Sequence, residues 1–384
     1  MIWQSGPILG IETSCDETAA AIVAPDSAGR PCVLSNIIAT QHDLHARYAG
    51  VVPEIASRAH LEKITPIIRE SLAAARMSYA DLRAIAVGNR PGLIGSLLVG
   101  VSAAKSLACA LGIPLVGVDH VAAHLHAPLL ITQSSHSPKT DDSRIKDAVG
   151  DDEHAKFPAL GLVVSGGHTS LFYLSDPLTM RLLGKTIDDA IGEAYDKVAT
   201  ILNLGYPGGP KLDQLAAEGG GDASAYALPS APLSRETMDF SFSGLKTAVL
   251  YAVCGHPVGR GASARFERDA SQLSDRERAN VAASFQHAAC AIIVRKMKRA
   301  MEFLEETDEM RPRMLLVGGG VSANSLLRLR LAEFAKDHEV ELRLPVMEYC
   351  MDNAAMIAGY GLARLQAGEM DDLTLAASAN TSLR

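Results

Sequence analysis

The stretch ILGIETSCDETAAAIV, residues 8–23, decides the fold, because an apolar run leads into a tight polar turn and then a second apolar run. The same plan returns as LGLVVSGGHTSLFYL at residues 160–174. Two apolar runs joined by a short turn predict a β-hairpin. Such turns leave backbone N–H groups facing a concavity that can hold phosphate oxygens. One hairpin near the start of each half of the chain predicts two lobes with a nucleotide site between them.

A third stretch, LLVGGGVSAN at residues 315–324, predicts a buried strand, a glycine turn and a helix N-cap at Ser322–Asn324. Elsewhere, strand signals alternate with helical ones, which is typical of an α/β protein. Residues 32–40 predict a third strand, and residues 84–112 predict a strand, a turn and a helix. Further helices are predicted at 60–77, 186–205, 280–306 and 351–366.

Composition limits the class of protein. The chain has 384 residues, of which 48% are hydrophobic, and this is enough for two domains with their own cores. It contains no run of eighteen apolar residues, so we expect a cytosolic protein without a signal peptide or membrane span. Six scattered cysteines without a C-x-x-C pair predict reduced thiols. A net charge of −8 argues against a general nucleic-acid binder, so any RNA contact needs local patches or partners.

Two polar segments interrupt the pattern, at residues 133–156 and 252–277, and both predict irregular surface insertions. We expect the closing helix, 352–366, to pack back on the first lobe. The predicted organisation is an N-terminal lobe over residues 1–130, a polar insertion over 131–157 and a C-terminal lobe over 158–384.

His120 and His124 lie four residues apart in HVAAH. On a helix this spacing puts both imidazoles on one face, as metal ligands require. A zinc-protease motif needs a glutamate directly after the first histidine, and that position is Val121. On spacing alone, two histidines on a helix surface remain the simpler interpretation.

The motifs IETSCDET, VVPEIASR, SGGHT, YPGGP, DFSFSGLKT and GGGVSAN occur in this order between about Ile8 and Met370. Together they resemble the bacterial tRNA N6-adenosine threonylcarbamoyltransferase family. The resemblance implies a two-lobed actin/sugar-kinase/Hsp70-like fold with duplicated βββαβα-type domains. It implies transfer of a threonylcarbamoyl group from threonylcarbamoyl-AMP to N6 of the adenosine 3′ of the anticodon, in tRNAs that read codons beginning with A.

The resemblance also implies one Fe(II) or zinc ion, held by His120, His124 and Asp352. Some relatives add a tyrosine ligand where this chain has Val163, so the ion should keep an open position. Asp352 has a second interpretation as the N-cap of the last helix, and the two roles are compatible. The implied partners are tRNA, a shorter paralogue of the same fold and a small P-loop ATPase, with an interface near residues 60–77 and no membrane.

For the donor, the resemblance implies a set of binding residues in the second half: Val163, Val164, Ser165, Gly166, Gly167, Asp196, Gly209, Asp213 and Asn324. SGGHT could instead be a plain hairpin turn, and Asp196 could belong to a solvated acidic stripe with Asp189 and Glu193. The pattern identifies no general base, and Glu12 is the one candidate that we name.

Two other functions fit the sequence. One is an ATP-dependent small-molecule kinase of the same fold, in which Asp16 would serve phosphate-bound Mg²⁺. The paired histidines count against it, because Mg²⁺ prefers oxygen ligands. The other is a non-catalytic nucleotide-binding scaffold. Arg90 stands where relatives have a glycine, which questions the backbone role of that turn.

Overall fold

The computed structural model describes residues 3–46, 48, 50–132, 146–147, 155–230, 236–259, 265–266 and 268–383. Most of the predicted insertion 133–156 and part of 252–277 lie outside these described residues. Within them, Lys146–Asp147 forms a short strand, β7. The second predicted insertion is helical at both ends, because α7 continues to Cys254 and α8 begins at Asp275.

The N-terminal sheet starts with the hairpin that the sequence predicts. The first two strands pair antiparallel, with Ile8 opposite Val23. The sheet order is β5-β4-β1-β2-β3-β6, and β4 and β5 run parallel to β1. The strands are β1 (Ile8–Glu12), β2 (Glu17–Pro25), β3 (Pro31–Thr40), β4 (Ala84–Arg90), β5 (Leu115–Asp119) and β6 (Ile131–Thr132).

The C-terminal sheet repeats this plan. Its order is β10-β9-β8-β11-β12-β7, so β8 to β12 occupy the places that β1 to β5 hold in the first sheet. The antiparallel hairpin again comes first, with Val164 opposite Thr169. The strands are β8 (Ala159–Val164), β9 (Thr169–Leu174), β10 (Met180–Lys185), β11 (Met314–Gly318) and β12 (Glu341–Leu344). The predicted duplication is confirmed.

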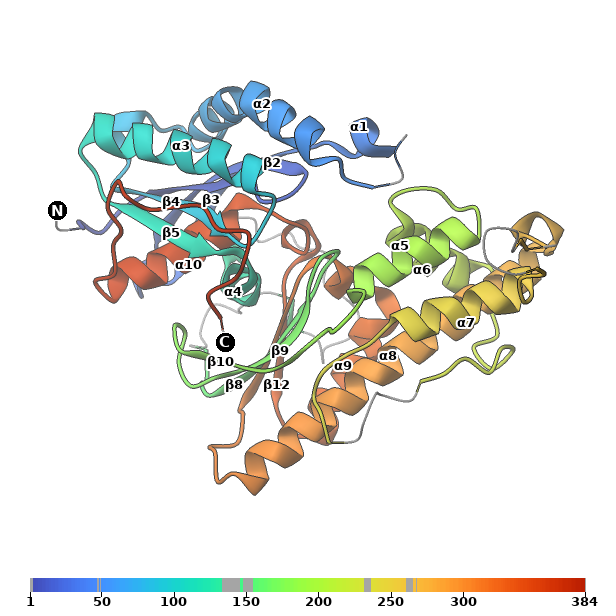
Figure 1. Cartoon of the computed structure of the whole chain (residues 1–384). Coiled ribbons are helices and arrows are strands. Elements are labelled where there is room, and N and C mark those ends of the chain that lie inside the picture. Colours follow the sequence, from blue (N-terminus) through green and yellow to red (C-terminus); the bar gives the residue numbers. More distant parts are fainter. Residues whose placement is uncertain are drawn as a thin grey trace.

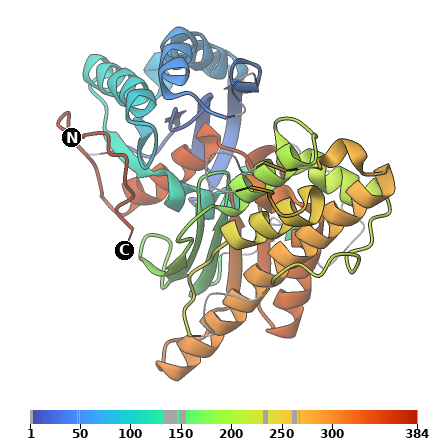
Figure 2. The ribbon, with the colours of Figure 1, turned by 45° about the vertical axis from the view of Figure 1, so that its right-hand side comes forward.

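Helices cover both faces of each sheet, as Figures 1 and 2 show. In the N-terminal lobe they are α1 (His42–Ala46), α2 (Pro53–Ala74), α3 (Ile94–Leu111) and α4 (His120–His126). In the C-terminal lobe they are α5 (Ile191–Ile201), α6 (Gly208–Glu218), α7 (Ser243–Cys254), α8 (Asp275–Glu306), α9 (Ser325–Asp337) and α10 (Ala354–Gln366). By length and composition α3 could cross a membrane, but its buried residues pack in the core beside α2, as in many layered domains.

The lobes exchange their closing helices. Although α10 follows β12, it packs on the N-terminal sheet, and α4 follows β5 but packs on β8 and β11. Each first strand carries a glycine at the contact. A Cβ on Gly10 would clash with the backbone of Ala354 in α10, and one on Gly161 would lie 2.8 Å from Leu125 in α4. Each helix therefore starts at the junction of the lobes.

Side chains fix where these helices begin. Asp119 Oδ1 accepts a hydrogen bond from Val121 N, which caps α4. Asn324 caps α9 by accepting from Leu327 N, as the sequence predicts. The cap of α10 is Asn353, whose Oδ1 accepts from Met356 N, so the alternative assignment of this cap to Asp352 is wrong. Because Asn353 caps the helix, the carboxylate of Asp352 is not used for capping.

Candidate functional site

The structure brings His120, His124 and Asp352 together where the lobes meet. Asp352 Oδ1 lies 3.5 Å from His120 Nε2 and 3.2 Å from His124 Nε2. Two ligands of a tetrahedral ion with bonds of about 2.0–2.1 Å are about 3.3–3.4 Å apart. Asp352 therefore lies at ligand separation from both histidines, and the three ligand atoms lie within 4.8 Å of one another. They converge because α4 and α10 are equivalent closing helices that both start at this junction.

His124 gives the sharper test of metal fit. It is fully buried, and apart from the 3.2 Å approach of Asp352 to Nε2, its ring nitrogens have no hydrogen-bond partner among the described residues. A buried polar atom without a partner costs free energy, whereas a bound ion would satisfy Nε2. Burial, followed by the neighbouring His120 charge, lowers the pKa of His124, which favours the neutral form that binds metals. The donor set fits a metal of the zinc or iron kind.

Glu12 stands behind His120 rather than in front of a substrate. Its Oε2 lies 3.2 Å from His120 Nδ1, and Ser14 Oγ lies 3.2 Å from the same nitrogen. Burial opposes protonation of His120, but the Asp352 and Glu12 carboxylates outweigh it and raise the pKa of His120 to about 9. A metal bound at Nε2 would take the place of the proton that these carboxylates favour. A carboxylate that holds Nδ1–H turns Nε2 toward a metal. Gly88 leaves room for this, because a Cβ there would lie 2.7 Å from Glu12 Oε2.

A third imidazole faces the cluster, and sequence reasoning gave it no role. The His168 ring, in the SGGHT turn, lies 6.2 Å from the His120 ring. Burial, then the charges of His120 and His124, lower the pKa of His168 to about 4. The SGGHT motif contains this histidine, but the sequence alone does not show that it lies near His120 and His124. That proximity arises from the packing of the two lobes.

The SGGHT turn is open on its ligand side. Ser165 and His168 close it through the hydrogen bond from Ser165 N to His168 O, 2.8 Å. Val163 and Val164 are buried strand residues, whereas Gly166 and Gly167 are exposed. A Cβ on either glycine would meet nothing within 4 Å, and neither has a left-handed φ. Free space, rather than an unusual backbone conformation, distinguishes this turn.

Asp196 and Gly209 belong to the YPGGP turn. Asp196 Oδ1 accepts a hydrogen bond from Gly208 N at 2.8 Å and thereby holds the start of α6. Burial raises the pKa of Asp196, although the amides of Gly208 and Gly209 oppose the change. Asp196 is therefore not part of a solvated stripe. A Cβ on Gly209 would meet nothing within 4 Å, so open space borders this residue, while its amide, like that of Gly208, faces Asp196.

Asp213 and Asn324 are joined through a residue that the sequence did not suggest. Gln286 Nε2 donates to Asp213 Oδ1 at 2.9 Å, and Asn324 Nδ2 donates to Gln286 Oε1 at 3.2 Å. Asp213 also accepts from Ser325 N at the start of α9. The sequence hinted at this residue only by placing a glutamine within the apolar stretch AASFQHAAC of α8, and the structure shows that Gln286 is buried.

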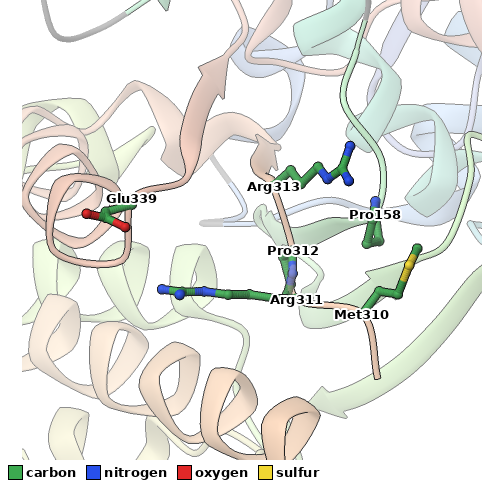
Figure 3. A pocket seen from close by; sticks show the side chains of 6 residues that line it. All are labelled: Pro158, Met310, Arg311, Pro312, Arg313 and Glu339. Carbon is green, nitrogen blue, oxygen red and sulfur yellow. The ribbon is translucent and has the colours of Figure 1, made fainter. Parts of the chain in front are cut away.

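Two further features lie outside this group. Arg90 is the last residue of β4 and does not have a left-handed φ, so the backbone does not require a glycine at position 90. A surface pocket of about 410 Å³ lies at the opposite edge of the C-terminal sheet, where β8 and β11 begin (Figure 3). It is lined by Pro158, Met310, Arg311, Pro312, Arg313 and Glu339, none of which belongs to the predicted site.

Comparisons with known proteins identify the family of this chain. A family model described as tRNA N6-adenosine threonylcarbamoyltransferase matches residues 32–140 and 144–359. Relatives with that description from Trichlorobacter lovleyi and Geobacillus kaustophilus are each 46% identical over 377 residues, which is 98% of this chain and 96% of theirs.

Solved structures test the fold alone. The crystal structure of full-length HypF in its phosphate- and nucleotide-bound form is 12% identical, with a TM-score of 0.55 over 99% of this chain. The match covers 48% of the HypF chain, so this chain spans about half of that protein. The likeness agrees with the two-lobed actin/sugar-kinase/Hsp70-like fold that the sequence predicts.

Proposed function

Because this chain belongs to the tRNA N6-adenosine threonylcarbamoyltransferase family, we propose that it moves a threonylcarbamoyl group from threonylcarbamoyl-AMP to adenosine N6 in tRNA. The chain is a tRNA-modifying acyltransferase. The acceptor is the adenosine 3′ of the anticodon in tRNAs that read codons beginning with A. The observation that carries this proposal is the convergence of His120, His124 and Asp352 beside the open SGGHT turn.

The reaction is acyl transfer from a mixed anhydride. Adenine N6 forms a bond to the carbamoyl carbon, the bond from that carbon to the phosphate oxygen breaks, and AMP leaves with the electron pair. N6 also releases one proton. Adenine N6 is a weak nucleophile, so holding both substrates in a reactive geometry should supply much of the rate.

The metal group supports one Fe(II) or zinc ion, held by His120, His124 and Asp352. When bound, such an ion supplies a Lewis acid for a carbonyl or phosphoryl oxygen. Glu12 holds His120 Nδ1–H, 3.2 Å away, which keeps Nε2 directed at the junction. We therefore assign Glu12 a positioning role in place of the general-base role that the sequence suggested.

The donor site is formed by the C-terminal lobe. Gly166 and Gly167 are exposed and border open space, so an anionic oxygen of the acyl-adenylate can approach their backbone N–H groups. Val163, Val164 and Ser165 position this loop. Asp196 and Asp213 offer acceptors for ribose hydroxyls, with Gly209 beside them, and Asn324 serves the adenine.

Partners follow from charge and from the exposed face of α2. A net charge of −8 does not favour tight tRNA binding by the chain alone. Leu61 on α2 is 69% exposed, within the segment where the sequence predicts an interface. We propose that a shorter paralogue of the same fold binds there and that a small P-loop ATPase completes the complex in the cytoplasm, without a membrane.

A direct assay tests the proposal. Unmodified tRNA, threonylcarbamoyl-AMP and the partner proteins are mixed with the chain, and modified adenosine is measured by mass spectrometry of nucleosides. We expect multiple turnovers with the partners and few without them. Transfer of phosphate from ATP to a small molecule would support the kinase, and nucleotide binding without any turnover would support the scaffold. The names of the relatives favour neither.

A further inference from the structure

A second group of potential ligands lies beside the first, on the β1–β2 hairpin. Asp16 belongs to the turn, Glu17 begins β2 and His42 begins α1. His42 Nε2 lies 3.3 Å from Glu17 Oε1, and one ligand atom from each of the three residues lies within 4.8 Å of the other two. The 3.3 Å separation equals that of two neighbouring ligands on one small ion.

Burial makes this group unusual. Asp16 is 6% exposed and Glu17 is 5% exposed, so both carboxylates lie out of bulk water. Among the described residues, the buried Oδ2 of Asp16 has no hydrogen-bond partner. Burying a carboxylate costs several kcal/mol unless it is paired or coordinates a metal. The orphan oxygen therefore points to a ligand.

The local charge also calls for a cation. Glu12, Asp16 and Glu17 are buried and lie near Asp352. Burial, followed by the Asp352, Asp16 and Glu12 carboxylates, raises the pKa of Glu17. In the described part of the chain, neither Asp16 nor Glu17 has a lysine or arginine ion pair. One divalent ion at His120 balances only part of this charge, and a bound adenylate adds more negative charge. A second cation or a proton must supply the rest.

We propose that Asp16, Glu17 and His42 form a second cation site, distinct from the one at His120, which takes a divalent ion such as Mn²⁺. Two carboxylates and one imidazole are a mixed oxygen and nitrogen set of the kind that Mn²⁺ accepts. The His42 ring packs edge-on at 5.8 Å from Tyr206 in the YPGGP turn, so the ion lies where the two lobes meet. This assignment stands on its own side chains and does not depend on the transferase proposal.

The test titrates Mn²⁺ in the absence of donor and tRNA, and it follows free Mn²⁺ by electron paramagnetic resonance. The starting protein is the full chain with His120→Ala and His124→Ala, which lacks the first site. We expect it to bind a single ion. Adding Asp16→Asn should weaken binding by more than the 10–100-fold typical of a supporting residue. Adding His42→Ala should also remove the ¹⁴N coupling of the bound ion.

Asp43→Asn is the matched control, because it removes one carboxylate charge at an exposed position next to His42. It should leave Mn²⁺ binding unchanged. If the double histidine variant unfolds, the wild-type chain loaded with one equivalent of Zn²⁺ replaces it, with the same variants, so that Zn²⁺ fills the site with two histidines first. An absence of Mn²⁺ binding, or equal binding after Asp16→Asn, would overturn the proposal and show that a proton holds the carboxylates together. Because no transfer step is measured, failure of the transferase assay would leave this result standing.

Discussion

The two equivalent hairpin turns use one backbone plan for opposite purposes. Between β1 and β2, the turn buries Ser14 and Asp16 beside Glu12, so its chemistry comes from side chains. Between β8 and β9, Gly166 and Gly167 are exposed, and a Cβ on either would meet empty space. The duplicated fold therefore offers acidic side chains on one wall of the junction and exposed glycine backbone on the other.

The closing helices differ in the same way. The N-terminal repeat ends in α4, which carries His120, His124 and His126 on seven residues. The C-terminal repeat ends in α10, which has no histidine, and its contribution is the carboxylate of Asp352 just before the helix. A metal group that needs imidazoles and a carboxylate is completed only because the repeats have diverged.

The largest effect should come from removing the imidazoles. His120→Ala with His124→Ala should eliminate the bound metal while the chain stays folded, because Asp119 still caps α4. A metal contributes several kcal/mol to a charged transition state, so transfer to tRNA should fall by roughly 10³-fold. Elemental analysis and circular dichroism are the measurements. His287→Ala, an exposed histidine on α8, is the control. Unchanged metal content would place the ion elsewhere.

The glycine turn should respond differently from the histidine helix. Gly167→Val puts a branched side chain into the space where the donor would lie, without backbone strain, since φ is not left-handed. Steric exclusion should exceed the 0.5–1.5 kcal/mol of one hydrogen bond, so donor binding should weaken by more than about tenfold. Metal content should not change.

Calorimetry with a non-hydrolysable threonylcarbamoyl-adenylate analogue measures this loss. Gly244→Val, at another open position in the first turn of α7, is the matched control and should bind like the wild-type chain. Wild-type affinity in a folded Gly167→Val protein would mean that the turn is only a hairpin, and the contrast between the two turns would lose its functional meaning.

Local signals explain what the sequence could predict. The hairpins and the Asn324 cap depend on residues within a few positions, so pattern reading finds them. The sequence offers Asp352 as the cap of α10, but Asn353 is an equally good cap. Sequence patterns do not locate the end of a helix to within one residue. The approach of His42 to Glu17, of His168 to His120 and of Gln286 to Asp213 depends on packing between distant segments, which no local pattern encodes.

A smaller effect should follow from changing the residue behind the metal ligand. Glu12→Gln keeps the shape of the side chain but removes the charge that faces His120 Nδ1. Loss of such a supporting group typically weakens metal binding by about 10–100-fold. Competition with a chelator measures the affinity. Ser14→Ala removes the neutral neighbour of the same nitrogen, 3.2 Å away, and should cost less. If both changes weakened metal binding equally, the negative charge of Glu12 would not be what supports His120.

The last prediction concerns folding stability rather than metal or donor binding, and it centres on His126, where the two closing helices touch. Its ring packs 4.5 Å from that of Tyr360 on α10, and Nε2–H donates to Pro177 O at 2.9 Å. Burial, only partly opposed by this hydrogen bond, lowers the pKa of His126 from its ordinary value of about 6.5 to about 4. Between these values the unfolded chain binds more protons than the folded chain, so folding stability must fall as pH falls from about 6.5 to 4.

This difference in pKa corresponds to about 3 kcal/mol of unfolding free energy, present above pH 6.5 and lost by pH 4. His126→Gln keeps an N–H donor for Pro177 O but cannot titrate, so its stability should depend less on pH. Urea unfolding at pH 7 and pH 4.5 compares the two proteins. His287→Gln should keep the wild-type slope, because that histidine is exposed. If His126→Gln also keeps the wild-type pH dependence of stability, burial between the helices does not hold the imidazole neutral. The histidines of α4 would then matter only for metal binding.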